Sequence, residues 1–354
     1  MILLMTGATG AFGRRMLRTV ADCDEVERIY VLGREDRRQM VSRKIEFIAG
    51  DITKEIEIAD RTRGEITAIL HAAAETRFSA PLETARRVNV VGSANLIGLA
   101  SSCPKLNRFI FLSTVYVTGK RRARVFENEI IEPDGFVNAY EQSKFEAEQF
   151  LRARMADLPI VICRLSTILG HARTGEIDKI GAIHQAIQLY YYSLLPMIPG
   201  TAESPVDLIS SEYAVAAVDF FLRHGFESGK TFHISAADDA IPLMEFLQIV
   251  RQCFLQNRPE WRRRAIELPA VTELKTFDLF VRTVEQTGSP ALRQSVMATK
   301  YFAPQLAYPK LFDDRECAFA LAGGAIKKPV LRDFLGRIVG HLIQEKRHFA
   351  RDNS

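Results

Sequence analysis

Tyr140 and Lys144 lie four residues apart in NAYEQSKFEAEQF, the charged stretch at 138–150. The stretch predicts a solvated helix, and a spacing of four places both side chains on one side of it. A phenol with a pKa of about 10 is a poor acid–base catalyst at neutral pH. A neighbouring ammonium would stabilise the phenolate and lower that pKa, so the pair predicts proton transfer by Tyr140.

Hydroxyl side chains end the strand that we expect just upstream, at 108–114. Ser113 and Thr114 would lie at the C-terminal edge of a parallel strand, where open α/β sheets bind their ligands. The Thr114 hydroxyl could hydrogen-bond a substrate oxygen that gains charge as a hydride arrives, and Ser113 is the alternative donor. Tyr-x-x-x-Lys alone is more often a surface helix, but in this order it predicts the catalytic set Thr114, Tyr140 and Lys144.

A glycine-rich turn, TGATGAFG, follows the first expected strand and puts glycines at Gly7, Gly10 and Gly13. Glycines there let the backbone turn tightly and let a pyrophosphate approach the N-terminus of the next helix. The spacing differs from Gly-x-Gly-x-x-Gly, and a tight turn without a ligand is the alternative. Its place at the start of a strand–helix–strand unit favours dinucleotide binding.

The second expected strand ends VLGRE, with Gly33 at its tip and Arg34 next. Dinucleotide sites place an acidic residue here for a ribose 2′-hydroxyl, or an arginine for a 2′-phosphate. Arg34, with Arg37 and Arg38 beyond it, therefore favours NADP over NAD. Glu35 argues the other way, and an arginine-rich solvated turn is the alternative.

The elements that must position these residues alternate between strands and helices, which is typical of a doubly wound, Rossmann-type α/β fold with a parallel sheet. We expect strands at 2–7, 28–33, 45–50, 68–73, 108–114 and 159–166, and helices at 12–21, 82–102 and 138–156. After residue 170 the alternation stops. Residues 205–210 and 231–236 should return to the sheet, and the remainder is mainly helical, with an apolar stripe at Leu331, Phe334, Leu335, Ile338 and Leu342.

Two domains are therefore predicted in the 354 residues. An NADP-binding domain would comprise 1–170 plus about 205–236. A smaller, mainly helical substrate-binding lobe would comprise about 171–204 plus 237–354.

The composition is that of an ordinary globular protein, with 47% apolar and 25% charged residues. A formal charge of +4 implies no nucleic-acid partner. Five isolated cysteines suggest neither disulfides nor a metal site, and fit a reducing cytoplasm. The N-terminus lacks a signal peptide's basic region, and the apolar stretch at 189–199 is too short to span a membrane. We expect a soluble, cytoplasmic protein, whose oligomeric state the sequence does not indicate.

The ordered motifs TGATGAFG, AGDIT, HAAA, NVVGSANLIGLA, FLSTVYVTG, YEQSK and VDLIS resemble the extended short-chain dehydrogenase/reductase superfamily over most of residues 1–236. HAAAETRFSAPLETARRVNVVGSANL and STVYV are most similar to its male-sterility-type NAD-binding branch, the thioester reductases and fatty acyl-CoA reductases. That branch reduces carrier-bound or CoA-bound acyl groups with NADPH.

The resemblance implies a role for each matching residue. Thr114 would be the hydroxyl donor, Tyr140 the proton donor, and Lys144 would hold the nicotinamide ribose. The implied cofactor-binding residues are Thr6, Gly7, Gly10, Ala11, Phe12, Gly13, Arg34, Asp51, Ile52, Ala72, Ala73 and Lys144. Asn89 and Ser93 match a family pair that we expect to be structural. Leu165 stands where the family has proline. We expect this difference to change the local path of the chain that shapes the acyl end of the site.

The function that follows is an NADPH-dependent reduction of an acyl thioester, CoA-bound or carried by an acyl carrier protein, to aldehyde or alcohol. A nucleotide-sugar epimerase or dehydratase with bound NAD would use the same Tyr–Lys pair. The third alternative is a non-catalytic NADP-binding sensor or scaffold. The Thr114, Tyr140 and Lys144 set argues against it, because a protein that only binds NADP has no need of a phenol with an altered pKa.

Three further groups have an ordinary explanation that we prefer. We expect His71 to lie at a strand end with its ring hydrogen-bonded to backbone groups, and not to act as a base. Tyr190, Tyr191 and Tyr192 are more often core than the lining of an acyl channel. Arginines at 121, 122, 124 and 262–264 are more often solvated than a docking surface for a carrier or CoA.

Overall fold

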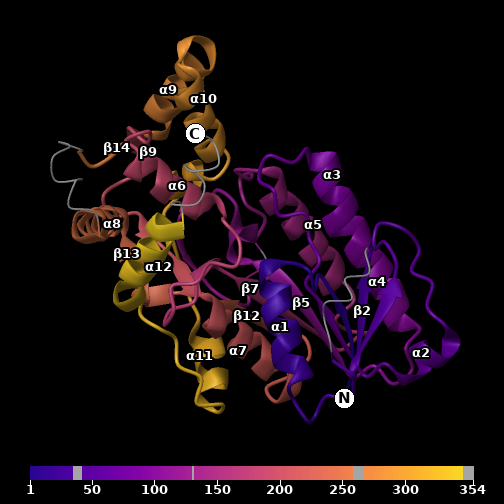
Figure 1. The fold of residues 1–354 in the computed structure, drawn as a ribbon. Helices are drawn as coiled ribbons and strands as arrows, with labels where there is room; N and C mark the ends of the chain where they lie inside the picture. The colour runs from indigo at the N-terminus through magenta and orange to yellow at the C-terminus, as the bar shows by residue number, and fades with distance from the viewer. Residues whose placement is uncertain (35–41, 130, 258–266, 346–354) are drawn as a thin grey trace, which may run out of the picture.

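The computed structural model describes residues 1–34, 42–129, 131–257 and 267–345 (Figure 1). Seven parallel strands form the central sheet, in the order β3-β2-β1-β4-β5-β7-β12. Their bounds are β1 (Ile2–Thr6), β2 (Arg28–Gly33), β3 (Ile45–Ala49), β4 (Ala68–His71), β5 (Arg108–Thr114), β7 (Ile160–Leu165) and β12 (Thr231–Ile234). The strand order reverses between β1 and β4, which confirms the predicted Rossmann-type sheet and puts a ligand crevice at their C-terminal ends.

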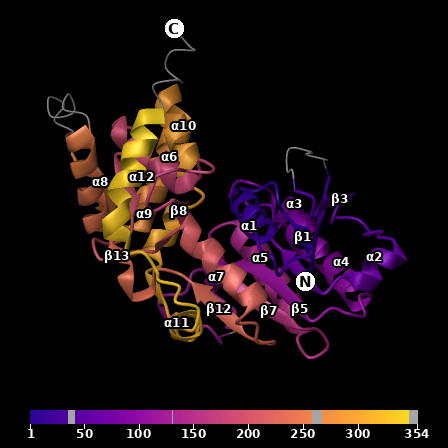
Figure 2. The same cartoon turned by 60° about the horizontal axis from the view of Figure 1, so that its bottom comes forward.

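Helices cover both faces of the sheet, as Figures 1 and 2 show. One face carries α1 (Ala11–Ala21) and α7 (Ser211–Arg223), and the other carries α3 (Leu82–Arg86), α4 (Gly92–Ser101) and α5 (Ala139–Arg152), with α2 (Asp60–Glu65) nearby. Strand residues alternate between the two cores: Leu3 and Met5 pack towards α1, and Leu4 packs towards α4. Burial on both faces explains why these strands are nearly all apolar.

The helix predicted at 82–102 is continuous but irregular. A π-helical turn at Arg87–Val91 joins α3 to α4. Such turns are rare and frequently occur at functional sites.

Residues 205–210 do not join the central sheet, so that prediction is wrong. β10 (Pro205–Val206) pairs antiparallel with β13 (Ile241–Pro242), and β11 (Leu208–Ser210) pairs parallel with β8 (Thr167–Gly170). The reason is that β12 already occupies the free edge of β7. β8 follows β7 directly along the chain and gives β11 a separate partner.

A second, mainly helical lobe lies beside the sheet. It contains α6 (Ala182–Tyr191), α8 (Leu243–Asn257), α9 (Leu274–Thr287), α10 (Pro290–Thr299), α12 (Leu331–Glu345), and the paired strands β9 (Met197–Pro199) and β14 (Ala270–Thr272). Its core includes the predicted stripe of α12, from Leu331 to Leu342. The smaller helical lobe is thus confirmed, while the proposed domain boundaries stay a prediction.

Part of the C-terminal chain returns to the half of the molecule that contains the central sheet. β15 (Lys310–Phe312) pairs with β6 (Ala123–Val125), and α11 (Arg315–Ala322) buries Cys317 and Leu321 in the core that α1 and α7 share. The two lobes are therefore joined by several chain crossings. None of the helices in the described ranges combines the length and apolar character needed to cross a membrane.

Candidate active site

A cleft of about 1130 Å³ opens at the C-terminal edge of the sheet, between the sheet and the helical lobe. The glycine turn and the ends of β4 and β5 line one side, and side chains of α6, α8 and α10 line the other. The ends of β1, β4 and β5 meet there because they are neighbours in register.

The structure brings nearly all of the predicted site residues into this cleft. Gly7, Gly10, Ala11, Phe12, Gly13, Arg34, Asp51, Ile52, Ala72, Ala73, Thr114, Tyr140 and Lys144 line it. Thr6 is fully buried beneath the cleft floor.

The glycine turn packs directly on the segment after β4. Gly7 has a φ of +74°, and a Cβ there would lie 2.5 Å from Ala72 C and Ala73 N. A Cβ on Gly13 would overlap the Gly7 carbonyl oxygen. Gly10 is the N-cap residue of helix α1 and has no side chain to cap it, which leaves the first N–H groups of the helix for an anion. The turn therefore fits a dinucleotide pyrophosphate.

Arg34 and Asp51 line the cleft just after β2 and β3, the two strands at the sheet edge opposite β12. The Asp51 carboxylate accepts a hydrogen bond from Thr53 N at 2.9 Å. That bond and the nearby Arg34 charge hold the Asp51 pKa below its usual value. The Arg34 guanidinium, on this side of the cleft, could form an ion pair with a ribose 2′-phosphate. Glu35, Arg37 and Arg38 lie outside the described residues.

Tyr140 occupies the first turn of α5, which Asn138 caps by accepting a hydrogen bond from Glu141 N at 3.0 Å. Its hydroxyl lies near that of Thr114, a residue that is 4% exposed at the end of β5. Burial raises the pKa of Tyr140 to about 12, and the Thr114 contact lowers it only in part. The expected acidic phenol is therefore wrong for this structure, in which Tyr140 carries its proton at neutral pH.

Lys144 lies behind the Thr114 and Tyr140 hydroxyls rather than beside them. Its Nζ donates to Leu112 O at 2.6 Å and sits 4.0 Å from the centre of the Phe111 ring. Burial lowers the Lys144 pKa to about 7, against the opposing charge of Glu148. Four-residue spacing places Lys144 on the side of the helix that carries Tyr140, but its long side chain turns towards the sheet.

Ser113 is engaged elsewhere, which leaves Thr114 as the hydroxyl beside Tyr140. Ser113 Oγ donates to Glu148 Oε2 at 2.8 Å, and Arg164 Nε donates to both Glu148 oxygens at 3.0 and 3.1 Å. Burial alone would raise the Glu148 pKa, but Arg164, helped by Arg152 and Ser113, outweighs this effect and lowers the pKa to about 2. This ion pair was missed from the sequence, although an arginine inside an expected buried strand is its signal.

Arg164→Met is expected to destabilise the fold by about 3–5 kcal/mol, because it leaves Glu148 buried with too little positive charge. Chemical denaturation measures this change in the free energy of unfolding. The control is Arg86→Met, since Arg86 pairs with Glu146 on the surface. An exposed pair contributes under about 1 kcal/mol. Equal losses in the two variants would contradict a stabilising role for the buried pair.

The wall opposite the sheet is apolar. Ile187, Tyr190, Phe246, Val250 and Leu306 line it. Of the three tyrosines of α6 and its end, Tyr190 faces the cleft, the Tyr191 ring packs on Phe254, and Tyr192 is 45% exposed. Of these three tyrosines, Tyr190 alone lines the cleft, and it also belongs to the core of the helical lobe.

Leu165 keeps β7 regular up to its end, where it pairs with Thr114 across the ladder. A proline at this position would have no N–H to donate to a sheet. Leu165 and Ser166 then continue along the cleft wall, and Ser166 Oγ donates to Asp207 O at 2.9 Å.

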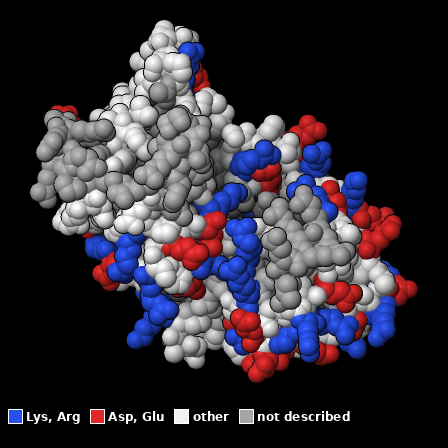
Figure 3. All heavy atoms as spheres, in the orientation of Figure 1, with Lys and Arg blue, Asp and Glu red and all other residues white. Residues whose placement is uncertain are grey.

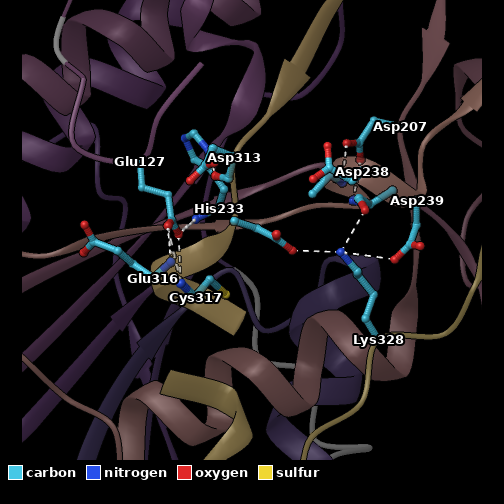
Figure 4. Close-up of polar contacts among 12 residues, drawn as sticks. Glu127, Asp207, His233, Asp238, Asp239, Asp313, Glu316, Cys317 and Lys328 are labelled. Atoms are coloured by element: carbon cyan, nitrogen blue, oxygen red, sulfur yellow. Dashed lines mark hydrogen bonds and ion pairs between the residues drawn. The ribbon is translucent and has the colours of Figure 1, made fainter. Parts of the chain in front are cut away.

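Asp207, in VDLIS, also fixes the neighbouring wall. Its carboxylate accepts from Ala236 N at 2.8 Å and Ala237 N at 3.1 Å. Lys328 holds the same segment from the other side, donating at 2.8 Å to both Ala236 O and Asp314 Oδ2 (Figure 4). These contacts attach the cleft wall to the chain that leaves β12.

Glu127 makes a further attachment at β12, the edge strand of the sheet (Figure 4). Its carboxylate accepts backbone hydrogen bonds from His233 at 2.9 Å, Glu316 at 2.8 Å and Cys317 at 3.1 Å. Burial raises the Glu127 pKa to about 7. The residue is structural, because it ties the start of α11 to β12.

The basic runs have partners within the chain. Arg121 pairs with Glu129 at 2.7 Å, Arg124 pairs with Asp238 at 2.5 Å, and Arg122 stacks on Tyr308. Figure 3 shows acidic and basic side chains interspersed over the sheet half of this face. Residues 262–264 lie outside the described residues.

Comparison with known proteins gives one family. The model of the NAD-binding family described as "Male sterility protein" matches residues 5–218. Among curated relatives, a hybrid PKS-NRPS synthetase of Xenoacremonium sinensis is 27% identical over 231 residues, 61% of this chain and 6% of that protein. A putative fatty acyl-CoA reductase of Drosophila melanogaster is 23% identical over 271 residues, 60% of this chain and 50% of its own length. The chain thus spans half or less of these relatives.

Solved structures agree on the fold. The terminal R domain of the myxalamid PKS-NRPS biosynthetic pathway is 21% identical, with a TM-score of 0.78 covering 98% of this chain and 91% of that one. The UDP-glucuronic acid 4-epimerase of Bacillus cereus in complex with NAD is 17% identical, with a TM-score of 0.60 covering 86% and 97%.

The family model covers well over half of the chain, and the sheet order and glycine turn agree with it. The chain belongs to the male sterility protein family and has the fold of the NAD(P)H-dependent oxidoreductases of the extended short-chain dehydrogenase/reductase type.

Proposed function

We propose that the protein is an NADPH-dependent reductase that converts an acyl thioester to an aldehyde and a thiol. The observation that carries this proposal is that the Thr114 and Tyr140 hydroxyls lie near each other at the end of β5. They lie in one cleft with the glycine turn on one side and an apolar wall on the other.

The turn fits a dinucleotide, since a Cβ at Gly7 would meet the Ala72–Ala73 backbone and a Cβ at Gly13 would meet the Gly7 carbonyl oxygen, so only glycines allow the tight turn that a pyrophosphate site needs. Gly7, Gly10, Ala11, Phe12 and Gly13 would hold the pyrophosphate. Asp51 and Ile52 would hold the adenine, Arg34 the 2′-phosphate, and Ala72, Ala73 and Lys144 the nicotinamide half, with Thr6 supporting the floor. When bound, NADPH supplies the hydride.

Thr114 and Tyr140 would act on the substrate oxygen. As the thioester carbon gains a hydride, charge develops on that oxygen, and the two hydroxyls can donate hydrogen bonds to it. A phenol with a pKa raised to about 12 holds its proton until a strongly basic oxyanion forms. Tyr140 then gives up that proton, and the hemithioacetal collapses to aldehyde and thiol.

Lys144 is placed to support the phenolate that remains. It lies one helical turn from Tyr140, and its Nζ now bonds only to a backbone carbonyl and a ring face among the contacts of the described residues. A pKa of about 7 leaves an appreciable fraction of the side chain charged at neutral pH.

A long acyl chain and its carrier suit the rest of the cleft. The apolar wall of α6 and α8 can bury a hydrocarbon tail. A carrier-bound substrate is supported by a structural neighbour, a thiolation-reductase di-domain from an archaeal non-ribosomal peptide synthetase, at a TM-score of 0.72 and 19% identity over 98% of this chain and 75% of that one. Acyl-CoA is supported by the fatty acyl-CoA reductase relative.

The test is consumption of NADPH by purified protein with acyl-CoAs, acyl-pantetheines, free aldehydes and nucleotide sugars. Oxidation of NADPH by thioesters supports the proposal. The likeness to the epimerase supports a second candidate, a nucleotide-sugar epimerase or dehydratase. That enzyme would be purified with NAD bound, and would convert a nucleotide sugar without consuming added NADPH.

Arg34→Ser is expected to weaken NADPH binding roughly tenfold and to leave NADH binding nearly unchanged, because a single charge-assisted contact to the 2′-phosphate is lost. Calorimetric titration with each cofactor measures both dissociation constants. Arg28→Ser, outside the cleft at the start of β2, is the control. Equal weakening of NADPH and NADH by Arg34→Ser would contradict the 2′-phosphate assignment.

A further inference from the structure

Five buried polar side chains form a continuous path beneath the cleft, which we call the polar spine: Thr6, His71, Ser93, Asn89 and Ser143. Each is 1% exposed or less. They come from β1, β4, α4, the π-helical turn and α5. No step of the proposed reaction uses His71, Ser93, Asn89 or Ser143.

The protons of the spine can be assigned from its acceptors. Ser93 Oγ lies 2.6 Å from Asn89 O, and a carbonyl oxygen can only accept, so the single hydroxyl proton of Ser93 points there. Ser93 Oγ must therefore accept from His71 Nε2, at 3.0 Å. Burial lowers the His71 pKa to about 3, helped by the Lys144 charge, so the ring is neutral.

A neutral ring that is protonated on Nε2 accepts at Nδ1. His71 Nδ1 lies 2.8 Å from Thr6 Oγ1, so Thr6 donates to it. Thr6 Oγ1 in turn accepts from Ala73 N at 3.2 Å. His71 thus bonds to two side-chain hydroxyls, which corrects the expectation of backbone partners.

The other end of the spine reaches the helix that carries the reactive phenol. Asn89 Nδ2 donates to Ser143 Oγ at 2.9 Å, and Ser143 Oγ donates to Tyr140 O at 3.0 Å. The Asn89 side chain also makes two hydrogen bonds to the backbone of Glu75. Its Oδ1 accepts from Glu75 N at 2.8 Å, and its Nδ2 donates to Glu75 O at 3.1 Å. Every donor in the path points the same way, from Ala73 to Tyr140.

We propose that the polar spine is a positioning device that sets the cofactor floor at Ala73 relative to the Tyr140 hydroxyl, with His71 held as the Nε2–H tautomer. The inference deepens the proposed function and rests on it. A fully satisfied buried network has one arrangement with complete hydrogen bonding, so it fixes the distance between the elements it joins. Because misplacement by about 1 Å can cost a hundredfold in rate, such a device matters to hydride transfer.

The first test is independent of turnover. Nitrogen-15 NMR of histidine-labelled protein reports which ring nitrogen carries the proton. The expected result for His71 is a neutral Nε2–H ring that does not titrate between about pH 6 and 8, assigned by the loss of its signal in His71→Gln. An Nδ1–H ring, or a ring that gains a proton in that range, would overturn the proposal.

The second test separates positioning from stability. Ser143→Ala is expected to lower kcat roughly tenfold while the dissociation constant of NADPH changes less than about twofold. Ser93→Ala should lower kcat similarly, and Ser93→Thr, which keeps the hydroxyl, should restore it. The control is Ser101→Ala, whose exposed hydroxyl bonds to Ile97 O on the same helix as Ser93 and should leave kcat unchanged.

The outcomes of these tests distinguish the two proposals. If the wild-type protein reduces thioesters but Ser143→Ala and Ser93→Ala keep the wild-type kcat, the spine has no positioning role. If wild-type protein reduces no thioester, the proposed function fails, and the NMR result still decides the hydrogen-bond path.

Discussion

Tyr140→Phe is expected to lower thioester reduction by about 10²–10⁴-fold while leaving NADPH affinity nearly unchanged. The variant loses the hydroxyl that gives a proton to the substrate oxygen. It keeps the aromatic ring, whose centre lies 5.7 Å from the centre of the Phe78 ring. Steady-state kinetics and a binding titration measure the two effects separately.

Tyr30→Phe is the matched control for this change. Its hydroxyl donates to Glu65 Oε1 at 2.8 Å, outside the residues that line the cleft. Its turnover should equal that of the wild type. Tyr140→Phe turnover within about threefold of the wild type would remove Tyr140 from the reaction, because general acid catalysis contributes far more than that.

Gly13→Ala is expected to weaken NADPH binding by at least about a hundredfold, because the new methyl group meets the Gly7 carbonyl oxygen. That contact is with backbone, so the turn itself must shift and the pyrophosphate loses its N–H donors. Fluorescence titration with NADPH gives the dissociation constant, and circular dichroism checks that the variant is folded.

Gly64→Ala is the control for the added methyl group. A Cβ at Gly64 meets nothing within 4 Å, and the residue lies in α2. Cofactor affinity should be unchanged, and stability should rise by up to about 1 kcal/mol because alanine favours a helix over glycine. If folded Gly13→Ala bound NADPH as tightly as Gly64→Ala, the glycine turn would not be the pyrophosphate site.

Much of the fold follows from local sequence. The six strands predicted in the first half all form, because continuous apolar runs between helical segments have few alternatives to a buried parallel sheet. The glycine turn and the hydroxyl side chains at the end of β5 could be predicted from the sequence for a similar reason. The chemistry of such a site requires particular residue types at fixed places in a strand–helix unit.

The direction of long side chains could not be predicted. Spacing on α5 indicated that Lys144 and Tyr140 share a side of the helix, but Lys144 Nζ reaches back to Leu112 O. Burial then raises the phenol pKa where the sequence suggested a lower one. Burial and side-chain direction depend on the packing of α5 against β5, which local sequence does not specify.

Pairings between distant segments were also missed. β11 pairs with β8, and Glu148 pairs with Arg164 on the next strand. The first depends on which sheet edge is free once all strands are assembled, and the second on which strands α5 packs against. The polar spine was missed for the same reason, since its five members come from five elements.

The most direct test of the account follows one hydrogen isotope. The protein is incubated with an acyl thioester and NADPH that carries deuterium at the transferable C4 position, and products are analysed by mass spectrometry. The account predicts one deuterium on the carbonyl carbon of the aldehyde, with one free thiol released for each NADP formed. Intact thioester, with the deuterium still on the nicotinamide, would contradict it.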